Sequence, residues 1–529
     1  MSRINLSDFS GADDLARINA ALAYMKDHPG TTLFIEPGTY YITTDLARET
    51  QKKVMAGELG ANPEPVMFNP KFVYSRGLDF DGHAGSRVEA YGVTLMVDGF
   101  MEVVSIRNCR DIEVCGLTVD LVRKAYSKGI VTSWTKREDG NGDIEVEFVE
   151  KSPITKTMPT IRSVFYSPVK CRFEVQRGLR DFEYIDEHHA RFVTGLGEEC
   201  LGDELYLWHT FHSRPTVLIE EAQNTVLRDI TIHNQCGMGI TAQHATDILI
   251  ERLNVIPSIG EHMSTNTDAT HFASCRGKLT LDGCRFEGQG DDSINVHTYY
   301  YTLDSRDGDV LTLSVKAPTG THAQSLDYPE VGDRLELTEK ATLNQTDTFR
   351  VVEVEKDFDN WVCRVKLDRP IPDDMEGLFF ADPDELPELI FRNCTARNHF
   401  ARSILIKCRK ALVENCEISD VAETAVKIAA EAGWHEGIGT SDVTVRGCRF
   451  INNGRWNQSC GGVAVYMDVA DRSALTHDFV TVEDNIIECP EAEHGIIVTN
   501  TKKAVVRRNK IISRSEDIVI GDGVEVICE

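Results

Sequence analysis

A short repeat constrains the fold of this 529-residue chain more than any other sequence feature. Apolar stretches end in a small polar residue that is often followed by cysteine. Asn393 recurs 22 residues later as Asn415, and Asn485 recurs 24 residues later as Asn509. Periods of roughly 20–50 residues are typical of solenoids, in which each repeat forms one coil. The repeated pairs are Asn108-Cys109, Gly283-Cys284, Asn393-Cys394, Asn415-Cys416 and Gly447-Cys448.

The repeated segments have the period of strands. In "VLRDITI" (226–232) and "IERLNV" (250–255), about 23 residues apart, apolar residues alternate with a period near 2 rather than 3.6. The leucine-rich repeat pattern Leu-x-x-Leu-x-Leu is absent. We therefore predict an all-β fold, a right-handed parallel β-helix. The repeated cysteines are then expected to pack inside the coils as small apolar residues rather than to bind a metal.

The ends and the interruptions of the repeat suggest the domain organisation. Leu15, Ile18, Leu22 and Met25 form one apolar stripe, which predicts a helix that covers the first coil. Two long stretches lack the repeat and contain alternating strands, so we expect two inserted β-barrel-like domains. The expected units are a capped first part of the β-helix (1–122), an inserted domain (123–213), a central part (214–298), a second inserted domain (299–387) and a last part (388–529).

Composition limits the partners and the compartment. The formal charge is −28, which argues against nucleic acid and anionic membranes as partners. No stretch of about 18 apolar residues predicts a membrane span. The 15 cysteines are scattered, as in a reducing cytoplasm. Residues 1–11 carry no secretory signal, so a complete sequence predicts a cytoplasmic protein. If a signal was removed, the protein is secreted or periplasmic.

Aligning successive repeats places residues in columns. "DATHFA" (268–273) lies over "DSINVH" (292–297), and "GMGITAQ" (237–243) lies on the coil before them. "ARSILIK" (401–407) and "AETAVKI" (422–428) continue the stack. The first column contains Met238, Asp268, Asp292, Arg402 and Glu423, the second contains Thr241, His271 and Asn295, and the third contains Gln243, Ala273, His297 and Lys407.

This alignment gathers three carboxyl groups. Asp268 and Asp292 become neighbours on adjacent coils, about 4.8 Å apart, and Asp291 precedes Asp292. Carboxylates at this spacing repel, which raises at least one pKa or requires nearby cations such as Arg402 and Lys407. Carboxyl groups with separated pKa values serve as the acid and the base of glycosidases. The three aspartates are therefore the catalytic candidates, and turn formation at residues 290–292 is the structural alternative.

Other residues near these carboxyl groups are candidates for substrate binding. His271 and His297 flank the aspartates, although a histidine on a strand is often only a structural residue. Arg402 and Lys407 also fit a simpler role, in which they only neutralise the charge of the aspartates. Trp434, in the loop "EAGWHEG", could stack on a sugar ring or anchor its loop. The predicted substrate-binding residues are His271, Asn295, His297, Arg402, Lys407, Glu423, Trp434 and Gln243.

The run "NTDATHFASCRGKLTLDGCRFEGQGDDSINVH" (266–297) resembles the central motif of family 110 glycoside hydrolases. The resemblance is specific there and in the Trp434 loop, and loose over the rest of the chain. Enzymes of that family are β-helix exo-enzymes that remove terminal α-1,3-linked galactose with inversion and without a metal. The resemblance implies Asp268, Asp291 and Asp292 as catalytic residues and no cofactor. Thr298 stands where that family commonly has glycine, which bears on the sugar that is accepted.

The same residues also resemble polygalacturonases, which share Asn-Thr-Asp and Asp-Asp segments on a β-helix. Their Gly-His-Gly motif is missing, and "RSILIK" (402–407) matches their Arg-x-Lys only loosely. That resemblance implies Asp291 as the general acid, with Asp268 and Asp292 holding the attacking water.

Two other functions remain open at this point. A polysaccharide lyase would use the carboxylates to hold Ca²⁺ and Arg402 or Lys407 as the base, and its product would absorb near 235 nm. A carbohydrate-binding β-helix without activity would hydrolyse no aryl glycoside. The expected partner is in each case an oligosaccharide or glycan, and the sequence is compatible with a homo-oligomer.

Overall fold

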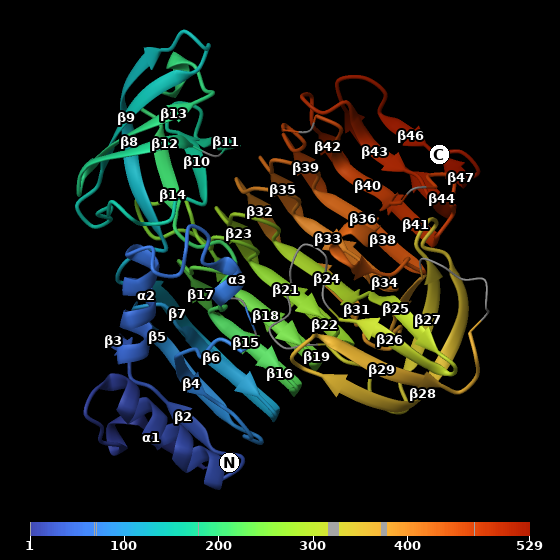
Figure 1. Cartoon of the computed structure of the whole chain (residues 1–529), viewed down its shortest axis with the longest axis horizontal. Coiled ribbons are helices and arrows are strands. Elements are labelled where there is room, and N and C mark those ends of the chain that lie inside the picture. Colours follow the sequence, from blue (N-terminus) through green and yellow to red (C-terminus); the bar gives the residue numbers. More distant parts are fainter. Residues whose placement is uncertain are drawn as a thin grey trace.

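A computed structural model describes residues 2–67, 69, 71–177, 179–315, 327–371, 378–456, 458–469 and 471–528. The body is a parallel β-helix that runs from the N-terminal to the C-terminal end of the molecule (Figure 1). Consecutive coils pair in parallel, so each strand lies beside its equivalent on the next coil. The predicted fold class, a right-handed parallel β-helix with an N-terminal cap and two insertions, is confirmed.

One sheet of the β-helix carries the chemistry described below, and we call it the site sheet. It contains 12 strands within the described part of the chain. Its strand β37 (Glu436–Gly437) pairs antiparallel with its neighbours. The parallel strands are β4 (Arg76–Asp79), β6 (Glu102–Arg107), β15 (Val217–Glu220), β18 (Ile240–Gln243), β21 (Thr270–Ala273), β24 (Ile294–Tyr299), β33 (Ile404–Ile406), β36 (Val426–Glu431), β40 (Cys460–Asp468), β43 (His494–Val498) and β46 (Ile518–Ile520).

The remaining faces of the coils form a second sheet, with 22 strands among the described residues. Its first strands are β1 (Arg3–Asn5), β2 (Thr32–Phe34), β3 (Gly38–Thr43), β5 (Arg87–Asp98), β7 (Arg110–Leu121), β16 (Gln223–Arg228), β17 (Thr231–Ile232), β19 (Thr246–Glu251), β20 (Asn254–Val255), β22 (Arg276–Asp282) and β23 (Arg285–Glu287). The later ones are β31 (Glu388–Arg392), β32 (Thr395–Arg397), β34 (Lys410–Glu414), β35 (Glu417–Ser419), β38 (Asp442–Arg446), β39 (Arg449–Ile451), β41 (His477–Glu483), β42 (Ile486–Glu488), β44 (Thr501–Arg507), β45 (Lys510–Ile512) and β47 (Glu525–Cys528).

Helix α1 (Asp14–Asp27) covers the N-terminal end of the β-helix (Figure 1). The side chain of Asp13 accepts a hydrogen bond from the Ala16 N–H at 2.8 Å, which caps the helix start. The predicted stripe is buried against the first coils, where it closes the core. Two shorter helices follow, α2 (Asp45–Met55) and α3 (Glu64–Met67).

Two insertions leave the coils and flank the site sheet (Figure 1). The first is an antiparallel sheet with seven described strands, β8 (Tyr126–Lys136), β9 (Gly142–Phe148), β10 (Arg162–Ser167), β11 (Arg172–Arg177), β12 (Arg180–Asp186), β13 (His189–Thr194) and β14 (Glu204–Trp208). The second is a closed barrel formed by β25 (Tyr301–Asp307), β26 (Val310–Ser314), β27 (Arg334–Glu339), β28 (Gln345–Asp357), β29 (Val362–Leu367) and β30 (Leu378–Ala381).

The repeated cysteines pack inside the coils, as the repeat predicts. Cys284, Cys394, Cys416 and Cys448 are at most 2 % exposed and belong to the core of the β-helix. The backbone N–H of Cys284 lies 3.4 Å from the sulfur of Cys394 on the next coil. All the cysteines are unpaired thiols. No helix among the described residues is both long and apolar enough to cross a membrane.

Candidate active site

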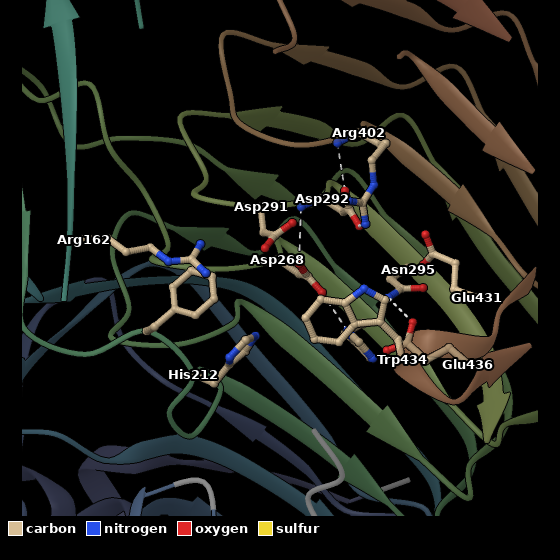
Figure 2. Close-up of a pocket in the computed structure, with 12 residues that line it drawn as sticks. Arg162, His212, Asp268, Asp291, Asp292, Asn295, Arg402, Glu431, Trp434 and Glu436 are labelled. Carbon is tan, nitrogen blue, oxygen red and sulfur yellow. Dashed lines mark hydrogen bonds and ion pairs between the residues drawn. The ribbon is translucent and has the colours of Figure 1, made fainter. Parts of the chain in front are cut away.

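A pocket of about 130 Å³ lies on the site sheet, where the first insertion and the loop after β36 approach the central coils. Figure 2 shows Arg162 and His212 on one side of this pocket, Glu431 and Glu436 on the other, and the three aspartates between them. We call it the aspartate pocket. Its lining residues are Arg162, Phe211, His212, Asp268, His271, Asp291, Asp292, Asn295, Arg402, Glu431, Trp434 and Glu436.

The coil register brings the aspartates together. Thr241 pairs with His271, and His271 pairs with Asn295, so the predicted second column is confirmed. The same register places Asp268 beside Asp292 just before their strands begin. One oxygen from each of Asp268, Asp291 and Asp292 lies within 4.8 Å of the others. The predicted cluster of three carboxyl groups is therefore present in the structure.

Gly290 allows the chain to turn tightly just before Asp291. A Cβ atom at Gly290 would lie 2.1 Å from the carbonyl oxygen of Asn266 and 2.4 Å from the ring of Trp208. Neither a backbone atom nor the buried Trp208 can easily move away. Glycine at this position therefore lets the Asp291 turn pack against both the preceding coil and the first insertion.

Asp292 is bound by Arg402 on the next coil. One of its oxygens accepts from the Arg402 backbone N–H at 2.9 Å, and the other accepts from Arg402 Nη2 at 2.9 Å. Asp292 is 1 % exposed, and burial raises its pKa well above the usual range, although the Arg402 charge opposes that rise. Charge-assisted hydrogen bonds of this kind are roughly twice as strong as neutral ones. Asp292 is thus the aspartate that lies in direct contact with a cation.

Asp268 is held by two neighbours. Its Oδ1 accepts from the Asp292 backbone N–H at 3.2 Å, and its Oδ2 lies 2.6 Å from His271 Nδ1. His271 Nε2 in turn lies 2.7 Å from Nε2 of His297, whose Nδ1 donates to the carbonyl oxygen of Thr298 at 3.1 Å. Burial lowers the pKa of His297 to about 4, so this ring is neutral.

These distances locate the protons of the two histidines. The neutral His297 carries its proton on Nδ1 and accepts at Nε2, so His271 must donate from Nε2. The 2.6 Å contact between His271 Nδ1 and Asp268 also contains a proton. Asp268 and His271 therefore share one proton, and His297 keeps the His271 ring in this orientation.

Asp291 differs from the other two aspartates. It is only partly buried, and its carboxyl group has no hydrogen bond to any described residue. Burial first, and the charge of Asp268 second, raise its pKa to about 6, against the opposing charges of Arg402 and Arg162. The guanidinium of Arg162 is stacked 3.5 Å from the centre of the Phe211 ring. Asp291 is therefore a carboxyl group that titrates within about one unit of neutral pH and has no hydrogen-bond partner among the described residues.

A second group of charges supports the opposite side of the pocket. Lys407, which is 0 % exposed, donates to Glu436 and lies 2.8 Å from Glu431 Oε2. Lys427 donates to the other oxygen of Glu431. Burial tends to raise the pKa of Glu431, but the charges of Lys407 and Lys427 dominate and lower it to about 2. Asn295 Nδ2 donates to Glu436 at 3.3 Å, which connects this group to β24.

The predicted residues occupy three kinds of position. Asp268, Asp291, Asp292, His271, Asn295, Arg402 and Trp434 line the aspartate pocket. His297 and Lys407 lie behind the lining, buried against residues that belong to it. Gln243 is buried one coil away and is not part of the lining, and Glu423 faces a different pocket.

The predicted placement of Glu423 is wrong by one residue of register. Ile404 pairs with Val426, so Thr424 rather than Glu423 lies beside Arg402. A shift of one residue turns each side chain to the other face of a strand. As a result, Lys427 and Glu431 lie on the outer face of the site sheet, toward the pockets, while Val426 and Ile428 point into the core.

Some lining residues were not predicted from the sequence. Glu431 could have been found, because it is two alternations beyond Lys427 on the same face of β36. Glu436 follows Trp434 closely in the same loop. The others are Arg162, Phe211 and His212, which belong to the first insertion and the segment after it. The coil register contains no information about where an insertion packs.

The oxygens of the three aspartates are close enough to hold a cation. Their existing partners fit a cation poorly, because Arg402 occupies both oxygens of Asp292 and His271 occupies Asp268. The charges of Arg162 and Arg402 would also repel a metal ion at Asp291. The chemistry of this donor set is that of proton transfer.

The chain is similar to several known proteins. A family model for the "right handed beta helix region" matches residues 377–528. The α-1,3-galactosidase A of Bacteroides fragilis is 25 % identical over 96 % of this chain and 86 % of its own length. That of Shewanella woodyi is 26 % identical over 97 % of this chain and 86 % of its own.

Among solved structures, the A-module of a mannuronan C-5 epimerase from Azotobacter vinelandii aligns over 99 % of both chains, with 11 % identity and a TM-score of 0.43. An exopolygalacturonase from Thermotoga maritima aligns over 99 % of this chain and 91 % of its own, with 10 % identity and a TM-score of 0.37. The resemblance of residues 266–297 to family 110 glycoside hydrolases is confirmed, because this chain is similar to α-1,3-galactosidases over nearly its whole length.

Proposed function

We propose that this protein is a galactosidase-type glycoside hydrolase that removes terminal α-1,3-linked galactose from oligosaccharides or glycans with inversion. The observation that carries the proposal is the cluster of Asp268, Asp291 and Asp292 in three different environments. Pairs of carboxyl groups with separated pKa values are what glycoside hydrolysis requires. The names of the full-length relatives support galactose and the α-1,3 linkage.

In the proposed reaction Asp291 donates its proton to the glycosidic oxygen as the bond to the anomeric carbon breaks. Asp268 and Asp292 hold a water molecule and take up one of its protons as its oxygen bonds to that carbon. The leaving sugar carries away the proton of Asp291, and the cluster keeps the proton of water. Exchange of that proton with solvent and with Asp291 restores the starting state.

The spacing of the carboxyl groups bears on the stereochemistry. Inverting enzymes usually hold acid and base about 6.5–9.5 Å apart, and retaining enzymes about 5–5.5 Å. The nearest oxygens of the three aspartates lie within 4.8 Å, which on distance alone favours retention. Our proposal of inversion rests on the resemblance to family 110. It also requires Asp291 to turn toward the leaving group, which the absence of hydrogen bonds from described residues permits.

The first prediction concerns the product. We expect the protein to hydrolyse an α-1,3-galactosyl disaccharide and to release β-galactose first. Proton NMR in the first minutes of the reaction distinguishes the anomers before they equilibrate. Release of α-galactose would contradict inversion while leaving the hydrolase intact. No hydrolysis of any α-galactoside would contradict the proposed function itself.

The second prediction concerns pH. Asp291 must be protonated to act as the acid, and its pKa is raised to about 6. We therefore expect kcat/KM for an oligosaccharide to fall as the pH rises above about 6. Arg162 lowers the pKa of Asp291, so Arg162→Met should move this limb to higher pH. An unchanged limb in Arg162→Met would show that a group other than Asp291 titrates there.

A further inference from the structure

A larger hollow lies on the same sheet, toward the C-terminal end of the β-helix. It encloses about 430 Å³, and we call it the outer pocket. Its described lining comes mainly from β36, β40 and β43 and from the segment after β40. These residues are Glu423, Thr424, Lys427, Ser459, Cys460, Ala464, Tyr466, Met467, Asp468, Val469, Arg472, Ile497, Thr499 and Asn500.

An unbroken column of paired residues connects the two pockets. Asn295 in the aspartate pocket pairs with Leu405, and Leu405 pairs with Lys427. Lys427 then pairs with Ala464 and Ala464 with Ile497, all in the outer pocket. With about 4.8 Å between coils, Ala464 lies about 14 Å from Asn295 along the sheet. The site sheet runs continuously through these strands (Figure 1).

The two pockets share a wall. Lys427 lines the outer pocket and forms an ion pair with Glu431, which lines the aspartate pocket. On the other side of this wall, a Cβ atom on Gly433 would lie 3.2 Å from Asp468 of the outer pocket. Gly433 is the neighbour of Trp434, which is 45 % exposed in the aspartate pocket. The outer pocket therefore lies next to the loop that carries Trp434.

The side chains of the outer pocket fit a neutral sugar. Tyr466 is partly exposed, and Lys427 Nζ lies 4.5 Å from the centre of its ring. Apolar surface from Met467, Val469 and Ile497 stands beside polar groups, a mixture that suits the apolar faces and hydroxyl groups of a sugar. The charges of the outer pocket balance, because two side chains are cationic (Lys427 and Arg472) and two are acidic (Glu423 and Asp468). A uronic acid therefore gains no net electrostatic attraction.

We propose that the outer pocket binds the sugar units on the leaving-group side of the scissile bond of a neutral oligosaccharide. This inference rests on the proposed function and adds a preference for long substrates. A short aglycone such as nitrophenol occupies only the aspartate pocket, whereas a longer chain also contacts Tyr466. The outer pocket then raises kcat/KM according to the length of the substrate.

The test compares the wild type and Tyr466→Ala on two substrates. These are nitrophenyl α-galactoside and a neutral tetrasaccharide that ends in α-1,3-linked galactose. We expect Tyr466→Ala to lower the ratio of kcat/KM for the tetrasaccharide to that for the nitrophenyl galactoside about tenfold, or about 1.4 kcal/mol. Tyr466→Phe keeps the ring and should keep the ratio. Tyr41→Ala on β3, where Tyr41 is 62 % exposed, is the matched control that should not change it.

A second variant tests the inference independently, in case Tyr466→Ala does not fold. Ala464→Phe fills the outer pocket with an added ring and should lower the same ratio without removing Tyr466. Equal ratios in the wild type, Tyr466→Ala and Ala464→Phe would overturn the inference and leave the proposed function standing. A wild-type protein that hydrolyses neither substrate would overturn the proposed function, and this inference would fall with it.

Discussion

Replacing Asp291 with asparagine is expected to lower kcat for an oligosaccharide by about 10²–10⁴-fold, the usual contribution of a general acid. Asparagine keeps the shape of the side chain but cannot donate a proton of suitable acidity to the glycosidic oxygen. A dinitrophenyl galactoside needs little protonation because its leaving group is already a weak base. The loss of kcat should therefore be far smaller on that substrate. The measurement is kcat for both substrates in the wild type and in Asp291→Asn.

The companion variants separate the acid from the base. Asp292→Asn and Asp268→Asn should lose a comparable factor on both substrates, because a good leaving group does not replace the activation of water. Azide could restore turnover in these two variants by attacking from the position of the water, and it would give the β-azide from an α-galactoside. An equal loss on good and poor leaving groups in Asp291→Asn would show that Asp291 is not the acid.

The sequence predicts the fold well because every coil of a solenoid repeats the same short sequence pattern. Each coil has the same apolar alternation, so neighbouring coils can be aligned by pattern alone. This was sufficient to align Thr241, His271 and Asn295. The columns then gather the aspartates without any knowledge of tertiary contacts.

The alignment of Glu423 failed for a reason that the pattern itself contains. The segment "AETAVKI" has alanine at 422 and 425, and both alanines are buried, so small apolar residues mark either face. The predicted register would have turned Lys427 into the core beside Ile406. The observed register instead places Val426 and Ile428 there and keeps Lys427 outside. The charged side chain of Lys427 was therefore a better guide to the register of this strand than the two alanines.

Arg162 and His212 could not be predicted by any alignment of coils. They lie on β10 and after β14, in or beside the first insertion, and reach the aspartate pocket through the packing of that insertion on the β-helix. Residues 209–213 are bound to the coils by contacts such as Asn266 Nδ2 to the carbonyl oxygen of Thr210 at 2.8 Å. Such contacts depend on the three-dimensional shape of both parts and leave no periodic signal in the sequence.

Lys407→Met is expected to destabilise the protein by about 3–5 kcal/mol, the usual cost of removing one partner from a buried ion pair. Lys407 is fully buried between Glu431 and Glu436, which are 6 % and 5 % exposed. Methionine fills similar space but removes the ammonium group that pairs with Glu436. The free energy of unfolding, measured by urea titration with a check for two-state behaviour, gives the change.

Two further variants show whether the loss comes from the unpaired charge. Glu436→Gln added to Lys407→Met removes one uncompensated carboxylate, so the double variant should regain part of the stability that the single variant lost. Lys502→Met breaks the exposed pair with Asp478, whose side chains are 61 % and 49 % exposed, and should change stability by no more than about 0.5 kcal/mol. If the Lys407 and Lys502 variants lost equal amounts, the buried charges would not stabilise this side of the pocket. If the double variant were less stable than Lys407→Met, Glu436 would contribute through packing or hydrogen bonds, including the one from Asn295, rather than through its pairing with Lys407.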